Sequence, residues 1–281
     1  MPAISLVICV YRERDLLERL LRESAGCYDD LVVVHDGPDV DGIRKLVEEK
    51  GGRFFERPRE YQQEPHWPFA WGEAKHDWIL RLDSDEFPST EMKEWLNGFR
   101  RGPEPVKNVS GYTCIWPLWD GKRAVTKHWP GGRNFFFNRQ RVRFFGMVEQ
   151  TPVADGIFEA MRLILNHQPP RKSFGICNVL FRKQAYHWRR VIALSLLNPP
   201  TQLNCWRWTD PQWPIWWHEI RSRPLLTAFQ KVLLVPMWQS REIWRAERKI
   251  MPSTVLGSGL HPFLIAITFF FVRIQNRNSE S

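Results

Sequence analysis

Residues 1–82 alternate short apolar runs with amphipathic segments, and this alternation restricts the fold more than any other feature of the chain. Residues 4–10, 31–35 and 78–82 are apolar runs of the kind that forms strands buried on both faces. Residues 12–24, 41–50 and 67–76 have the spacing of helices, and residues 53–56 are a candidate third strand. We therefore predict an α/β domain with a parallel sheet and helices on both faces.

An acidic cluster follows the last of these runs. Residues 77–86 read Asp-Trp-Ile-Leu-Arg-Leu-Asp-Ser-Asp-Glu. If the strand continues through them, Asp83 and Asp85 project to the same side. A divalent cation would remove the repulsion between two such carboxylates, and hard cations prefer oxygen ligands. Ligands of open parallel sheets bind beyond the carboxyl ends of the strands. We therefore predict a Mg²⁺ or Mn²⁺ site that also holds a diphosphate; a polar, helix-capping loop is the alternative.

Three segments in this order resemble the family 2 glycosyltransferases of the GT-A fold. They are residues 4–11 (Ile-Ser-Leu-Val-Ile-Cys-Val-Tyr), residues 32–37 (Val-Val-Val-His-Asp-Gly), and the acidic segment just described. The resemblance covers about the first 190 residues well, and it is strongest to the branch that includes lipopolysaccharide-core glucosyltransferases. It implies a Rossmann-like nucleotide-sugar-binding domain, a nucleotide-sugar donor and a divalent metal.

The resemblance also implies roles for individual residues. Tyr11 and Glu13 would line the nucleotide pocket, although the family usually has Asn between them where this chain has Arg12. Asp36 would recognise the base, unless it is simply a turn residue before Gly-Pro. Asp83 would face the ribose and the metal, and Asp85 would be the direct metal ligand.

Inverting transfer also needs a base that takes the proton of the acceptor hydroxyl. Residues 144–152 match the loop that supplies it in the related enzymes, which often read Val-His-Glu where this chain has Val-Glu-Gln. Glu149 is the first candidate and Glu86 the second, with an ordinary exposed acid as the alternative for Glu149. His167 is a candidate for the metal site or the diphosphate, or else a capping or core residue.

Arg133 and Arg139 flank an aromatic run and are candidates to contact the leaving diphosphate, because Arg suits phosphate geometry. Solvated side chains on a strand edge are the alternative for both.

The pattern changes in the second half of the chain. Residues 111–117, 134–138 and 142–148 are candidate aromatic-rich strands, residues 173–197 have helical spacing, and residues 199–214 are rich in Pro and Trp. We therefore predict a catalytic domain over residues 1–170 and a mostly helical region over residues 171–281.

The C-terminal region is basic and rich in Trp. It holds 14 Lys/Arg against 4 Asp/Glu between residues 171 and 249, and 8 of the 15 Trp between residues 188 and 244. Trp and basic residues can stack on nucleic-acid bases, but they also suit an anionic membrane surface. The apolar segment 254–272 favours the membrane and argues against nucleic acid. It has three interpretations: a helix in the interface, a membrane span interrupted by Gly and Pro, or a packed helix.

The cysteine pattern indicates a reducing compartment. The five Cys are odd in number and none sit at metal-ligand spacing. No signal-peptide pattern precedes the first strand, so we expect a cytoplasmic protein on the inner face of a membrane.

The leading hypothesis is therefore sugar transfer from a nucleotide-sugar to a hydroxyl of a lipid-linked or cell-envelope glycan. One alternative is a catalytically inactive, membrane-peripheral binding protein that kept the fold. The other is a sugar nucleotidyltransferase, which the absence of Gly from residues 11–14 argues against.

Overall fold

The structure, a computed structural model, spans all 281 residues. It describes residues 1–105, 108–119, 121–124, 126, 132–144, 152–170, 180, 185–197, 215–248 and 251–279. The described residues form two compact units. Residues 1–144 with 152–170 make the N-terminal unit, and the described residues from 180 onward make the C-terminal unit.

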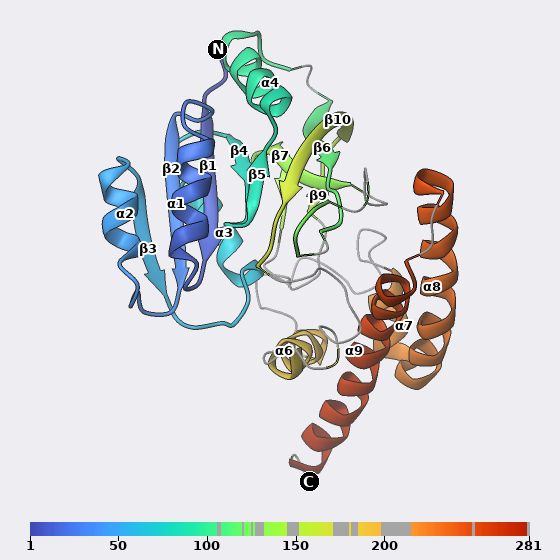
Figure 1. The fold of residues 1–281 in the computed structure, drawn as a ribbon. Coiled ribbons are helices and arrows are strands. Elements are labelled where there is room, and N and C mark those ends of the chain that lie inside the picture. The colour runs from blue at the N-terminus through green and yellow to red at the C-terminus, as the bar shows by residue number, and fades with distance from the viewer. Residues whose placement is uncertain are drawn as a thin grey trace. The chain divides into compact units, whose positions relative to one another are not determined.

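The N-terminal unit is built on one sheet of eight strands, in the order β3-β2-β1-β4-β7-β6-β10-β5 (Figure 1). A separate two-stranded sheet joins β8 to β9. The strands are β1 (Ile4–Val10), β2 (Asp30–Asp36), β3 (Arg53–Arg57), β4 (Trp78–Arg81), β5 (Glu86–Pro88), β6 (Val109–Ile115), β7 (Arg133–Asn138), β8 (Val142–Arg143), β9 (Val153–Ala154) and β10 (Ile157–His167).

Four of these strands form the parallel half of the sheet. β1 pairs in parallel with β2 on one side and with β4 on the other, and β2 pairs with β3. The chain therefore runs outward from β1 to β3 and then returns to the opposite side of β1. In open sheets of this kind, ligands bind beyond the carboxyl ends of the strands, beside such a reversal of strand order.

The other half of the sheet is mixed, so the prediction of a parallel sheet is correct only for β1 to β4. β7 pairs antiparallel with both β4 and β6, and β5 pairs antiparallel with β10. The pairing of β5 with β10 sets His167 opposite Glu86, although 80 positions separate them in the sequence. β5, β9 and the full length of β10 were not predicted. The candidate strand 142–148 is a strand only at β8, and residues 145–148 lie outside the described residues.

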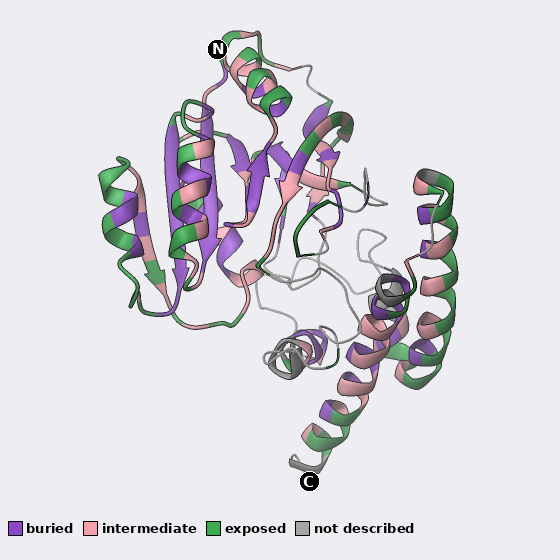
Figure 2. Ribbon diagram, viewed as in Figure 1, coloured by how far each residue is buried: buried purple, intermediate pink, exposed green. Residues whose placement is uncertain are grey.

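Helices cover both faces of the sheet, as predicted. The N-terminal unit holds α1 (Arg14–Glu23), α2 (Ile43–Glu49), the short 3₁₀ helix η1 (Glu64–His66), α3 (Trp67–Glu73) and α4 (Thr90–Arg101). One core lies between the sheet and α1, α2 and α4, and the other lies between the sheet and α3. Figure 2 shows the central strands buried along their length. These strands are continuous apolar runs because helices cover both faces of the sheet.

Three helices are shorter than the sequence predicted. α1 begins at Arg14 because Arg12 has a φ of +53°, a left-handed conformation that the first turn of a helix cannot contain. α2 begins at Ile43 because Gly42 has a φ of +73°, and it ends at Glu49. α3 ends at Glu73 because Ala74 is extended. The left-handed Arg12 bends the chain between β1 and α1, at the carboxyl end of β1.

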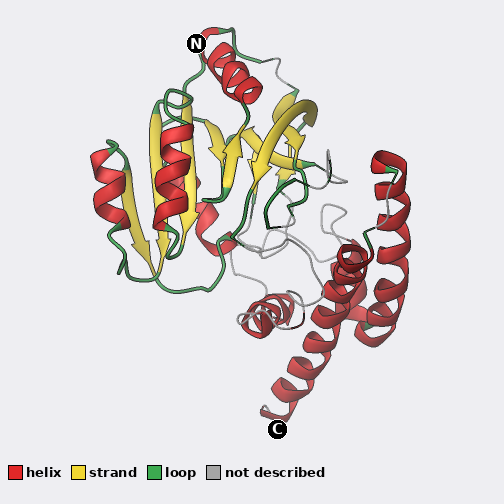
Figure 3. Cartoon of the chain, in the orientation of Figure 1, coloured by secondary structure: helices red, strands yellow, loops and turns green. Residues whose placement is uncertain are grey.

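The C-terminal unit is helical where it is described (Figure 3). Its helices are α6 (Ala185–Leu197), α7 (Ile215–Ser222), α8 (Pro224–Glu247) and α9 (Pro252–Ser279). Among the described residues, α9 holds the one stretch long and apolar enough to cross a membrane, Val255–Arg277, with a mean hydropathy of 1.9 and 41% of it buried. Gly259 and Pro262 do not interrupt this helix as the sequence suggested.

The two glycines Gly111 and Gly98 should respond oppositely to the same substitution. A Cβ on Gly111 in β6 would lie 2.5 Å from Phe158 and 2.7 Å from the Phe136 carbonyl oxygen, whereas nothing lies within 4 Å of that position at Gly98 in α4. We expect Gly111→Ala to lower the free energy of unfolding by about 1–3 kcal/mol. Gly98→Ala should raise it by about 0.5–1 kcal/mol, because Ala has the higher helix propensity. Urea denaturation measures both, and equal effects would contradict the close approach at Gly111.

Candidate active site

The loops that follow β1, β2 and β4 meet at one edge of the sheet. The register pairs Val10 with His35 and Val7 with Arg81, so the three strands end close together. Tyr11 follows β1 directly, Asp36 is the last residue of β2, and Asp83 comes two residues after β4. The residues selected from these three loops in the sequence therefore lie together beyond the carboxyl ends of β1, β2 and β4.

The acidic residues lie in a turn and not in the strand. β4 ends at Arg81, and the Glu86 N–H donates to the Asp83 carbonyl oxygen at 3.0 Å. Strand alternation therefore does not orient Asp83 and Asp85. Their directions are set instead by contacts with other strands.

Arg133, the first residue of β7, joins two of the carboxylates. Its Nη2 donates to Asp83 Oδ2 at 2.6 Å, and its Nε lies 2.7 Å from Glu86 Oε1. Glu86 is 0% exposed and also accepts hydrogen bonds from Trp116 Nε1 at 2.8 Å and from the Asp83 N–H at 2.9 Å. No substrate hydroxyl can reach Glu86 in this conformation, so its contacts make it an anchor for Arg133 and for the acidic turn.

Burial and charge oppose each other in this cluster. Burial raises the pKa of Glu86 to about 7 although Arg133 lowers it. Burial also lowers the pKa of the Arg133 guanidinium, but the attraction of Asp83 and Glu86 outweighs this, and the pKa of Arg133 is raised overall. Arg81, at the end of β4, adds a second guanidinium, whose pKa burial and Arg133 lower to about 10. These charged side chains can therefore be buried together only because the negative carboxylates lie beside the positive guanidinium groups.

Asp85 turns toward the end of β10. Its Oδ2 lies 3.4 Å from His167 Nε2, and its carbonyl oxygen accepts from the Gln168 N–H at 2.8 Å. The His167 ring stacks on Trp116, with ring centroids 4.0 Å apart and planes 21° from parallel. Trp116 therefore contacts both the Arg133–Glu86 pair and His167, and it holds the two parts of the site together.

A divalent metal fits this arrangement only with further ligands. Among the described residues, no three His, Cys, Asp or Glu side chains come together as a complete metal site. Asp83 is engaged by Arg133, which leaves Asp85 and His167 as the adjacent pair. Mg²⁺ sites commonly use one or two carboxylates and complete the shell with water and substrate phosphate oxygens, so Asp85 and His167 suit a metal that arrives with a diphosphate.

Asp36 is 3% exposed, and both of its oxygens are occupied. Oδ1 accepts from the Glu60 N–H at 2.6 Å and lies 2.9 Å from His66 Nε2, while Oδ2 pairs with Arg59. The Arg59 guanidinium carbon lies 3.2 Å from the centre of the Tyr11 ring. The Arg59 side chain, which is 19% exposed, is therefore more accessible beside Tyr11 than the side chain of Asp36.

Glu13 connects the first loop to the acidic turn, because it accepts a hydrogen bond from the Ser84 hydroxyl. Glu149 lies outside the described residues. Arg59 and Trp116 were not predicted from the sequence. The signals available there were the basic residues Arg57 and Arg59, at the end of β3 and just after it, and the Trp directly after β6.

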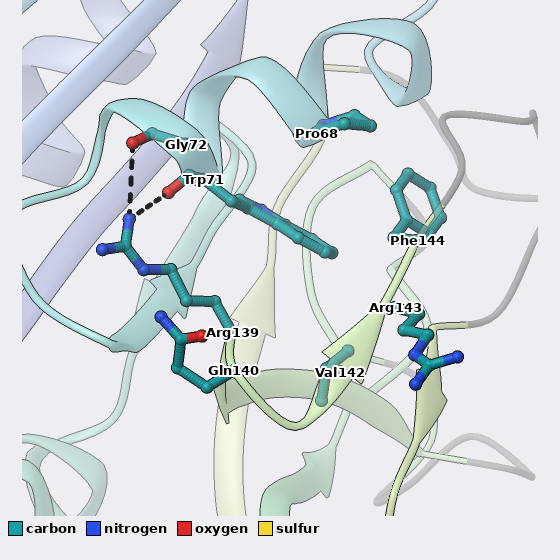
Figure 4. Close-up of a pocket in the computed structure, with 8 residues that line it drawn as sticks. All are labelled: Pro68, Trp71, Gly72, Arg139, Gln140, Val142, Arg143 and Phe144. Atoms are coloured by element: carbon teal, nitrogen blue, oxygen red, sulfur yellow. Dashed lines mark hydrogen bonds between the residues drawn. The ribbon is translucent and has the colours of Figure 1, made fainter. Parts of the chain in front are cut away.

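Arg139 does not belong to this site. Its Nε pairs with Asp77 at 3.0 Å, before β4 begins, whereas the acidic turn follows the end of β4. Its Nη1 donates to the Trp71 and Gly72 carbonyl oxygens at 2.6 and 3.4 Å (Figure 4). The same Nη1 donates to the Ala74 carbonyl oxygen at 2.8 Å, so Arg139 binds carbonyl groups at the end of α3. A shallow cavity of about 520 Å³ lies beside it, lined partly by Trp71, Val142 and Phe144. This cavity is therefore separate from the acidic site.

Comparison with known proteins identifies the domain. The family model described as "Glycosyl transferase family 2" matches residues 5–156, which is more than half of the chain. No curated protein sequence matches.

Likeness to solved structures is low. S. aureus TarS is 12% identical with a TM-score of 0.37, over 70% of this chain and 40% of that chain. TarS 1-349 is 12% identical with a TM-score of 0.39, over 93% and 90%. CMP:2-keto-3-deoxy-manno-octonic acid synthetase complexed with CTP is 14% identical with a TM-score of 0.30, over 42% and 54%. This chain thus spans 40% of the first of these proteins.

Replacing Arg133 should destabilise the protein more at high pH than at low pH. Arg133→Leu leaves Glu86 buried without its partner, which should cost about 3 kcal/mol of unfolding free energy near neutral pH. The Glu86 proton stabilises the folded wild type fully below about pH 4.3, the unfolded pKa. That stabilisation is lost as the pH rises to the folded pKa of about 7.

The variant should go on losing stability above pH 7, by up to about 1.4 kcal/mol per pH unit, because its Glu86 pKa rises further. Urea denaturation at several pH values measures the gap between the two proteins. The matched control is Arg44→Leu, which removes an exposed pair with Glu56 and should cost less than about 1 kcal/mol at every pH. If the difference in unfolding free energy between the wild type and Arg133→Leu were constant from pH 6 to 9, this account would be contradicted.

Proposed function

This chain belongs to glycosyl transferase family 2 and is a glycosyltransferase, and we propose that it transfers a sugar from a nucleotide-sugar to a hydroxyl of a lipid-linked or cell-envelope glycan. The observation that supports the proposal is that four groups lie beyond the carboxyl ends of the parallel strands. Three of them are the pairs of Tyr11 with Arg59, Asp83 with Arg133, and Asp85 with His167. The fourth group, Glu13, joins the first of these to the acidic turn.

The nucleoside of the donor binds at Tyr11 and Arg59 in this proposal. The ring and the guanidinium are already stacked, and Asp36 holds Arg59 in place. Asp36 then contributes to binding of the base by holding Arg59 in place, or it contacts the base directly after the Arg59 side chain moves away. Glu13 holds the loop after β1 against Ser84. This contact keeps the proposed nucleoside and diphosphate subsites in fixed positions relative to each other.

The diphosphate binds over the acidic turn. Asp85 and His167 would hold a Mn²⁺ or Mg²⁺ ion, with Asp83 toward the ribose, and such a metal neutralises charge on the leaving diphosphate. The Arg133 side chain is 18% exposed while Asp83 and Glu86 hold it. In this proposal its guanidinium contacts a phosphate oxygen of the donor, since Arg suits phosphate geometry. Its position is fixed before the donor binds, which lowers the cost of organising the site during the reaction.

Transfer with inversion requires a base for the acceptor hydroxyl, and we assign this role to Glu149. Its carboxylate would take the proton as the oxygen attacks the anomeric carbon. Glu86, the earlier second candidate, is completely buried and accepts three hydrogen bonds or ion pairs. It serves the reaction by holding Arg133.

The acceptor and the location of the enzyme follow from the C-terminal unit. Its basic charge and the apolar stretch Val255–Arg277 support peripheral association with the inner, anionic face of a membrane. The enzyme would then meet a lipid-linked acceptor, or an envelope glycan such as those of the lipopolysaccharide-core branch that the sequence resembles.

Removing the Asp85 carboxylate should abolish metal-dependent nucleotide binding without unfolding the protein. The hydrogen bond from the Gln168 N–H reaches the backbone carbonyl of Asp85, which Asp85→Ala preserves. We expect nucleoside diphosphate with Mn²⁺ to raise the melting temperature of the wild type and to have little effect on the variant. Asp41→Ala, an exposed acid in the loop before α2, is the control and should bind as the wild type does. Equal binding by the Asp85 variant would eliminate the metal site.

Glu149→Gln should lower the turnover number by roughly 10² or more and leave donor binding nearly unchanged, because only proton transfer is lost. Glu159→Gln, an exposed acid on β10, is the matched control. Turnover and nucleotide affinity are measured on the same preparations. Near-normal turnover in the Glu149 variant would assign the base to another residue.

A further inference from the structure

Helix α8 in the C-terminal unit exposes a long apolar face. Its exposed positions recur with helical spacing, and between residues 225 and 238 only Gln230 among them is polar. The side chains of this apolar face are 41–68% exposed, and Figure 2 shows exposed residues along α8. They are Leu225, Leu226, Phe229, Leu233, Leu234, Met237 and Trp238. An exposed apolar stripe of this length on a soluble protein marks a surface that binds something apolar.

The opposite side of α8 is buried and partly polar. Thr227 is 1% exposed and Gln239 is 8% exposed, with Ala228 and Ile243 buried beside them. Lys231 also forms an ion pair with Glu219 of α7, with 2.7 Å between Nζ and Oε2. A helix in water shows the reverse arrangement, with apolar residues inside and polar residues outside. The arrangement in α8 is that of a helix whose outer side meets lipid.

The packing of α8 on α9 fixes which side faces outward. A Cβ on Gly259 of α9 would lie 2.4 Å from the Pro236 ring of α8, so the two helices touch at a position where only Gly fits. Small residues that allow such close approach are typical of helix pairs in membranes. The apolar face therefore cannot turn inward to bury itself against α9.

Charge and length indicate what covers this face. Arg241 and Arg245 follow the apolar face along α8, and Arg248 comes directly after the helix. All three are exposed, and Arg223 precedes the helix. Trp244 lies among them and is also exposed. Trp and Arg at the edge of an apolar surface suit anionic lipid headgroups. Residues 225–238 rise only about 21 Å, less than the roughly 30 Å of a bilayer core, so α8 is suited to lie along a membrane and not across it.

We propose that α8 is the helix that binds the membrane surface, with its apolar face in the boundary between headgroups and acyl chains. Arg241, Arg245 and Arg248 contact the phosphates of anionic lipids beyond the end of that face. This inference rests on the membrane partner proposed above and identifies the surface that binds it. It differs from the interpretation of the sequence, which assigned the anchor to residues 254–272.

Vesicle flotation of the full-length protein tests the inference. The triple variant Phe229→Glu, Leu233→Glu, Met237→Glu should lower partition into phosphatidylcholine vesicles that contain phosphatidylglycerol by at least about tenfold, since it puts three charges where apolar surface enters lipid. Val40→Glu, at an apolar residue of the N-terminal unit that is 62% exposed, is the matched control and should float as the wild type does. Far-UV circular dichroism and nucleotide-dependent melting should be the same for all three proteins.

A second variant tests the contribution of charge. Arg241→Gln with Arg245→Gln should weaken binding to vesicles with phosphatidylglycerol and leave the weaker binding to pure phosphatidylcholine unchanged. If the variant lost binding equally to vesicles with and without phosphatidylglycerol, the proposed contact of these arginines with anionic headgroups would be contradicted.

The outcomes separate this inference from the proposal on which it rests. If the wild type and the triple variant float equally, the inference is wrong and another segment binds the membrane. If the wild type does not float, both the membrane partner and the inference fail. If the wild type does not float and sedimentation shows a dimer that the triple variant dissociates, the face joins two copies of the chain instead.

Discussion

The ion pairs of Arg133 with Asp83 and Glu86 are the contacts on which the active site depends. Arg133 begins β7 and the two acids flank the turn after β4, so the guanidinium joins adjacent strands of the sheet. A buried carboxylate such as Glu86 is tolerated only with a partner. The same contact therefore holds the sheet edge together and keeps a positive charge where the diphosphate of the donor would bind.

Trp116 extends this contact to the rest of the site. It donates to Glu86 and stacks on His167, which in turn lies beside Asp85. The acidic turn is thus held from two sides, by β7 through Arg133 and by β10 through His167. Polar and charged groups that are held in place before a reaction can stabilise the charge that develops on a leaving group. The stacked pair of Tyr11 and Arg59, where we propose that the nucleoside binds, is likewise already in contact without a ligand.

The two units of the chain use apolar residues in opposite ways. In the N-terminal unit the strands bury their apolar side chains in two cores, and Val7 and Leu6 face different helices. In the C-terminal unit α8 buries Thr227 and exposes Phe229. The first arrangement suits water, and the second suits a lipid surface. This difference is the basis of our proposal that the C-terminal unit binds a membrane surface.

The sequence alone determined the parallel half of the sheet, because a strand buried on both faces must be apolar throughout, as residues 4–10 are. It also located the acidic turn, since three carboxylates directly after such a strand are unusual. The tertiary structure alone decided which partners these acids take. Arg133 is 50 residues from Asp83, and the pairing of β5 with β10 brings His167 to Asp85. Local periodicity carries no information about strands that meet across such distances, so the mixed half of the sheet, the burial of Glu86 and the outward face of α8 appear only when the chain is folded.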